Sequence, residues 1–137
     1  MMTDFLDAHN RHWQDAEQLF TSSRLANADH LYGMAAECGL KRLMIVFGMP
    51  LKNDGSPAQK TDWIHANDAW TRYETYRMGH HHGVSMILPT QNPFSDWDVS
   101  QRYANQTNFT HSRVATHRLG AKAVHSLIAK AQKDGFI

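Results

Sequence analysis

Four arginine and histidine side chains gather between residues 102 and 117, where their types suit acid–base chemistry on a charged substrate. Arg113 and His117 are four residues apart, so their side chains can meet on one face of a helix. Arg102 and His111 precede them. A histidine with a pKa near neutrality suits a general base, and the permanently charged, forked arginine stabilises negative charge in a transition state. These residues form the first candidate site.

A metal or cofactor site is not expected. His80, His81 and His82 are adjacent in sequence, so on a helix their side chains would diverge by about 100° each, and the i,i+4 spacing of helical zinc ligands is absent. No strand-like segment leads into a glycine-rich turn, which argues against a dinucleotide site. Cys38 is the only cysteine, so no intrachain disulfide can form, and we expect a reducing, cytoplasmic location. No apolar run approaches the roughly 18 residues of a membrane span.

Periodic apolar residues predict the helices that must position these groups. Stripes at helical spacing cover residues 5–20, 24–47, 62–78 and 111–133, and we interpret 80–88 as a shorter helix. The intervening segments are rich in turn residues, and 99–108 is expected to form a turn or a short helical piece. No segment alternates like a strand. The sequence therefore predicts an all-α bundle of four to five helices, forming a single domain over residues 1–137.

Short polar residues and a glycine mark the expected ends of these helices. Ser22 or Ser23 is expected to cap the helix over 24–47, because a hydroxyl oxygen can accept from the unpaired N–H groups of the first turn. Thr61 has the same expected role for the following helix. Gly135 is expected to end the last helix.

Charge is distributed unevenly along the chain, although the net formal charge is only +1. Residues 1–40 carry two arginines against six carboxylates, whereas residues 101–137 carry six basic side chains against one carboxylate. These two thirds could pair within the fold, pair between subunits, or leave a basic surface for polyanions. On the helix over 24–47, His30, Glu37 and Lys41 lie opposite the apolar stripe. We expect a solvated face there, with a Glu37–Lys41 ion pair.

Aromatic residues recur at helical spacing in the second half of the chain. They are expected to pack in the core, since aromatic side chains dominate bundle packing, or else to form a platform on which nucleic-acid bases stack. They are Trp63, Trp70, Tyr73, Tyr76, Trp97 and Tyr103.

The order of helices and several motifs resemble the HEPN superfamily. The similar segments are WQDAEQLF at 13–20, ANADHLYGMAAECGLKRLM at 26–44, GHHHGVSMIL at 79–88 and QRYA at 101–104, ahead of a last amphipathic helix. The resemblance implies a helical bundle that forms a homodimer. It also implies either a metal-independent endoribonuclease, of the kind found in toxin–antitoxin and defence systems, or a non-catalytic module that binds nucleotides or a protein partner such as an antitoxin.

HEPN ribonucleases carry an Arg-x(4–6)-His motif near the start of the last helix. The chain contains this spacing at Arg24–His30, Arg77–His82 and Arg118–His125, close to the roughly two matches that chance predicts. None of the three lies where the family places the motif. At that place Arg113 and His117 are one residue too close and Arg102 and His111 too far apart, so the chain departs from the family pattern.

The resemblance nevertheless assigns catalytic roles to Arg102, Arg113 and His117, with His82 or His111 as a further base. It assigns phosphate binding to basic residues of the last helix, which are Arg118, Lys122 and Lys130. If the arginine and histidine groups converge in an open basic cleft, we expect catalysis. If Arg113 and His117 are sealed in packing, we expect the binding module. A plain structural dimer is the third alternative.

Overall fold

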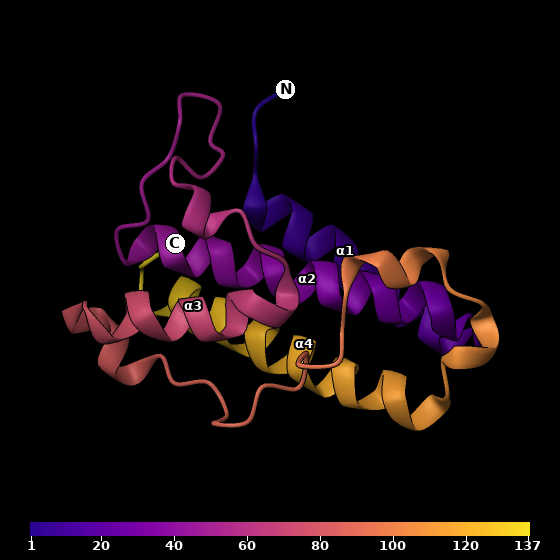
Figure 1. The fold of residues 1–137 in the computed structure, drawn as a ribbon. Coiled ribbons are helices and arrows are strands. Elements are labelled where there is room, and N and C mark those ends of the chain that lie inside the picture. The colour runs from indigo at the N-terminus through magenta and orange to yellow at the C-terminus, as the bar shows by residue number, and fades with distance from the viewer.

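The computed structural model describes residues 1–137 and contains four α-helices and no strand, which confirms the predicted all-α bundle (Figure 1). The α-helices are α1 (Phe5–Thr21), α2 (Leu25–Val46), α3 (Ala66–Met78) and α4 (His111–Lys133). Four short 3-10 helices lie between them: η1 (Lys60–Asp62), η2 (His81–Ser85), η3 (Val99–Tyr103) and η4 (Gln106–Asn108). None of the helices has the length and hydropathy that crossing a membrane requires.

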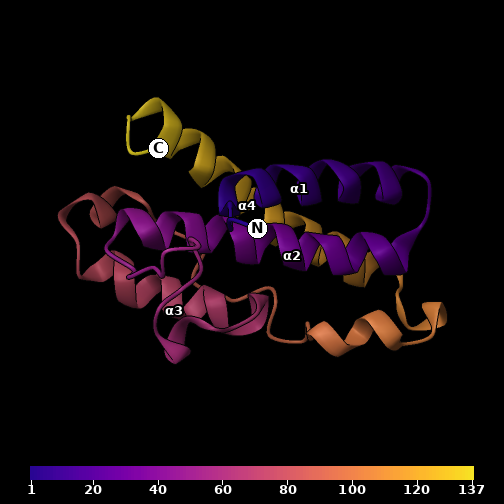
Figure 2. The same ribbon diagram turned by 90° about the horizontal axis from the view of Figure 1, so that it is seen from above.

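Helix α2 is the centre of the bundle. It contacts α1, α3 and α4, and also η3 and η4. Figure 2 shows α3 against the C-terminal half of α2, while the segment that carries η3 and η4 runs beside its N-terminal half. The predicted apolar stripe is largely buried, with Ala28, Tyr32, Ala35 and Leu43 fully inaccessible to solvent. Burial of this apolar stripe packs α1, α3 and α4 around α2.

The predicted solvated face of α2 is wrong. Glu37 and Lys41 are each only 6% exposed, although their predicted ion pair is present at 2.8 Å between Oε1 and Nζ. His30 is half-buried and stacks on the ring of Trp97. The reason lies in the tertiary structure. Neighbouring helices cover α2 on several sides, so the face opposite its apolar stripe is also inside the protein.

The bounds of α1, α2 and α4 follow the prediction to within one residue, whereas the predicted cap of α2 does not. Helix α4 has the expected bounds, and Gly135 follows it with a φ of 78°. The predicted serine cap of α2 is wrong, because Arg24 occupies the N-cap position and no side chain bonds to the first turn. Ser22 instead caps the end of α1.

Between α2 and α4, two further helix boundaries differ from the prediction. Thr61 lies within η1 and does not cap α3, which begins at Ala66 after His65. The helix expected over 80–88 is reduced to the single 3-10 segment η2. The short helical piece expected over 99–108 is present as η3 and η4.

Gly39 permits a close approach of α2 to α1 and α4. A Cβ added there would lie 2.5 Å from Val124 Cγ1 and 2.7 Å from His9 Nδ1. Gly39→Ala is therefore expected to lower the free energy of unfolding by about 1–3 kcal/mol, measured by urea denaturation. Gly79→Ala is the control, because its φ is −84° and its added Cβ would be 3.7 Å from the nearest atoms. Equal stability of the two variants would contradict this close packing.

Candidate functional site

His117 joins three parts of the fold that are distant in sequence. Its ring lies in α4 and is fully buried. Nδ1 is 2.6 Å from Asp29 Oδ1 on α2, and Nε2 is 2.8 Å from Asp96 Oδ1 in the loop before η3. Asp29 is also fully buried, whereas the Asp96 side chain is 58% exposed.

The charge state of His117 follows from these contacts. Ionised carboxylates only accept hydrogen bonds, so both ring nitrogens must donate and the ring is an imidazolium. Burial lowers the pKa of His117, but the hydrogen bonds and charges of Asp29 and Asp96 outweigh it and the pKa is raised. For Asp96 the effects have the opposite signs. Burial raises the pKa of its carboxyl, but the hydrogen bond from His117 and the charges of His117 and Arg113 outweigh burial and hold the pKa below its usual range.

Arg113 and Gln101 complete this cluster. Arg113 donates from Nη1 to Asp96 Oδ2 at 2.9 Å and from Nη2 to the Asp96 carbonyl oxygen at 2.7 Å. Gln101 Nε2 donates to Asp29 Oδ2 at 2.6 Å, and Arg113 Nε lies 3.9 Å from the same oxygen. Every polar group of the Asp29–His117–Asp96 cluster is therefore paired, and neither nitrogen of His117 is free to accept a proton.

The other expected catalytic residues do not join this cluster. Arg102 lies in η3, with its guanidinium 4.9 Å from the ring of Tyr103. His111 is exposed at the start of α4, with its ring 5.1 Å from that of Phe20. His82 lies in η2, with its ring 4.4 Å from Phe136 near the C-terminus. The structure thus brings together Arg113 and His117 only, through two aspartates.

The basic residues of α4 are mostly neutralised within the fold. Arg118 donates to both carboxylate oxygens of Glu17 on α1, at 2.7 and 2.9 Å. Lys130 pairs with Asp134 at 2.8 Å, and Lys122 is exposed. The acidic N-terminal part and the basic C-terminal part of the chain are therefore joined within the fold by the Arg118–Glu17 pair.

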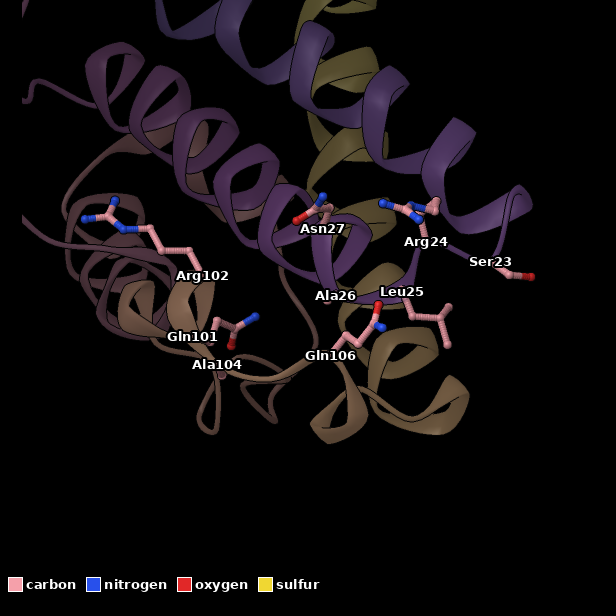
Figure 3. Close-up of a pocket in the computed structure, with 9 residues that line it drawn as sticks. All are labelled: Ser23, Arg24, Leu25, Ala26, Asn27, Gln101, Arg102, Ala104 and Gln106. Atoms are coloured by element: carbon pink, nitrogen blue, oxygen red, sulfur yellow. The ribbon is translucent and has the colours of Figure 1, made fainter.

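A polar pocket of about 220 Å³ lies beside the cluster, between the start of α2 and the segment η3–η4 (Figure 3). Arg24, the N-cap residue of α2, and Asn27 in its first turn line one side. Gln101, Arg102 and Gln106 line the pocket from the opposite segment. Gln101 therefore connects the pocket with the buried Asp29. Neither arginine forms an ion pair with a carboxylate, so both keep their charge available for an anion.

The aromatic residues divide between the two expectations. Trp70, Tyr73 and Trp97 are buried in the core, as bundle packing predicts. Trp63 and Tyr103 are 53% and 79% exposed. These two, on different segments, are available for stacking.

Asp29, Asp96 and Gln101 belong to the His117 cluster but were not predicted from the sequence. Asp29 carried a usable signal, because it lies at i,i+4 from Leu25 and at i,i+3 before Tyr32, within the core-facing side of α2. A lone carboxylate in that position requires a buried partner. Asp96 and Gln101 lie in non-periodic segments, where sequence spacing does not indicate direction.

The salient features are a buried imidazolium between two aspartates and a neighbouring polar pocket with two unpaired arginines. No family model, curated protein or solved structure matches the chain.

Proposed function

We propose that the protein is a HEPN-like helical module that binds RNA or a nucleotide without cleaving it. The environment of His117 carries this proposal. A ring with both nitrogens bonded to carboxylates has no lone pair to take a proton from a 2′-hydroxyl. Arg113 is likewise engaged by Asp96, so the two groups best placed for HEPN-type catalysis stabilise the fold.

The polar pocket and its rim supply what binding requires. Arg102 provides a charge for phosphate, and the adjacent Tyr103 provides an exposed ring on which a base can stack. Arg24 adds a second charge from the opposite wall, and Asn27 and Gln106 add amide groups for hydrogen bonds. A cation beside an exposed aromatic ring is the arrangement that single-stranded nucleic acids prefer.

Binding and cleavage are separated by incubating the purified protein with labelled single-stranded RNA in EDTA. We expect a salt-dependent complex and intact RNA. Arg102→Ala and Tyr103→Ala should each weaken binding by about tenfold, because one removes a phosphate contact and the other a stacking ring. Arg11→Ala is the matched control. This exposed arginine of α1 does not line the polar pocket, and it pairs only with Asp7.

Two outcomes would contradict the proposal. One is equal binding by the Arg102→Ala and Arg11→Ala variants. The other is metal-independent cleavage that is lost when His117 is replaced by glutamine while the protein remains folded, which would restore the endoribonuclease hypothesis and its toxin–antitoxin or defence setting.

The HEPN resemblance also supports a homodimer, or a complex with an antitoxin-like protein. Light scattering measures the mass directly. A mass of 15.7 kDa at all concentrations, which is that of one chain, would contradict the homodimer.

A further inference from the structure

A second pocket, of about 410 Å³, lies at the other end of α2 from the polar pocket. Lys41 lines it from α2, Lys52 from the loop after α2, and Trp63 and His65 from the segment before α3. The loop of residues 50–59 projects near the N-terminus in Figure 1, and Thr3 N donates to the Asp54 carbonyl oxygen at 2.7 Å. The pocket therefore has walls from three separate parts of the chain.

Lys41, which lines this pocket, pairs with Glu37, and both charged side chains are almost wholly buried. The side chains of Lys41 and Glu37 are 8% and 7% exposed. Glu37 Oε1 accepts from Lys41 Nζ at 2.8 Å, and Glu37 Oε2 faces His65 Nδ1 at 3.0 Å. Both oxygens of Glu37 are thus engaged. Lys41 keeps further N–H groups beyond the one given to Glu37, and it lines the pocket.

The contact with Glu37 also fixes the orientation of His65. Because a carboxylate only accepts, Nδ1 of His65 carries the hydrogen and Nε2 is left without a partner in the protein. The side chain of His65 is 50% exposed, so Nε2 can accept a hydrogen bond from solvent or from a ligand group that carries a donor.

The outer wall combines an aromatic ring with a cation. Trp63 is 53% exposed, yet its ring is held by the Nε1–H bond to the Pro57 carbonyl oxygen at 2.9 Å. Lys52 Nζ lies 4.7 Å from the centre of that ring and forms no ion pair with a carboxylate. A fixed, exposed indole beside an unpaired ammonium can stack a planar ring and bind its negative substituent.

We propose that this pocket binds a small planar anion, an aromatic ring that carries a phosphate or carboxylate group. The ring stacks on Trp63, and the anionic group lies between Lys41 and Lys52. This site is separate from the RNA-binding pocket proposed above, and it stands whether or not that proposal holds.

Titration calorimetry with phenyl phosphate and with benzoate tests the proposal on the full-length protein. We expect both to bind, and phenol and inorganic phosphate to bind at least about tenfold more weakly, because each supplies only half of the recognised chemistry. The difference between phenyl phosphate and benzoate identifies the preferred anionic group. In the ¹H–¹⁵N spectrum, the Trp63 indole signal, assigned with Trp63→Leu, should shift with phenyl phosphate.

Variants locate the site. Lys52→Ala and Trp63→Leu should each raise the Kd for phenyl phosphate by about tenfold and leave the fold intact, since both side chains are on the surface. Lys60→Ala, an exposed lysine of the same region that does not line the pocket, should change it by less than about twofold. The proposal is overturned by no binding at about 10 mM phenyl phosphate, by equal affinity for inorganic phosphate, or by equal effects of Lys52→Ala and Lys60→Ala.

Discussion

Replacing His117 by alanine is expected to lower the free energy of unfolding by about 3–5 kcal/mol, because it removes one partner of a buried ion pair. Asp29 is fully buried and would lose its only charged hydrogen-bond partner, which donates from His117 Nδ1 at 2.6 Å. Gln101 would remain, together with Arg113 at 3.9 Å, and these only partly compensate a buried carboxylate. Urea denaturation of the wild type and the variant measures the difference.

Two controls separate this effect from the loss of any histidine or carboxylate. His111→Ala removes an exposed histidine from the same helix and should change stability by less than about 0.5 kcal/mol. Asp96→Asn should cost about 1 kcal/mol or less, because this side chain is 58% exposed and an amide oxygen can still accept from His117. If His117→Ala were as stable as His111→Ala, the Asp29–His117–Asp96 cluster would not be formed in solution.

Acidification from pH 6.5 to pH 4 is expected to cost about 3 kcal/mol of stability through His9 alone. This ring is fully buried, and its Nδ1 donates to the Ala35 carbonyl oxygen at 2.7 Å. Its Nε2 therefore accepts from His125 Nδ1 at 2.9 Å, and protonating it would oppose two N–H groups. Burial lowers the pKa of His9 to about 4, with smaller contributions in the same direction from His125 and His12.

Acidification lowers stability because the unfolded and native states bind protons at different pH values. The unfolded chain protonates His9 near pH 6.5, whereas the native protein does so only near pH 4, so the unfolded state gains protons and stability between these values. His117 has the opposite effect on stability, because its pKa is raised in the native protein. Its contribution to the free energy of unfolding is complete below pH 6.5 and is lost as the pH rises through its native pKa. These two histidines thus favour maximal stability near pH 6.5.

His9→Gln isolates the first effect, since glutamine can still donate to Ala35 and accept from His125. Denaturation curves at several pH values should show that the fall in stability between pH 6.5 and pH 4 is smaller in the variant by most of the expected 3 kcal/mol. A direct NMR titration of the His9 ring in the wild type is independent of the variant's stability. A midpoint near 6.5 there would contradict the prediction.

Much of the architecture was predictable from local pattern. The apolar periodicity of residues 5–20, 24–47 and 111–133 gave three helices close to their observed bounds, because a repeat of 3.6 residues is a property of adjacent residues. The pairing of Glu37 with Lys41 was predictable for the same reason, since four residues separate them on one helix.

The candidate sites were not predictable in this way. Arg113 and His117 were singled out by type and spacing, but the partners that define their chemistry, Asp29 and Asp96, lie 88 and 21 residues from His117. Sequence spacing along one helix does not indicate which loop or helix will pack against it. The same limit applies to Glu37, whose second partner His65 is 28 residues away.

The sequence by itself therefore determined the helices, their apolar faces and the supply of imidazole and guanidinium groups. Only the tertiary structure decided which of these groups are buried and paired, because the pairing depends on contacts between helices and not within them. Helix α2 shows the difference most clearly: as an isolated amphipathic helix it would expose Glu37 and Lys41, and as the centre of the bundle it buries both. Burial then fixes their charges, their partners and the pockets that they line.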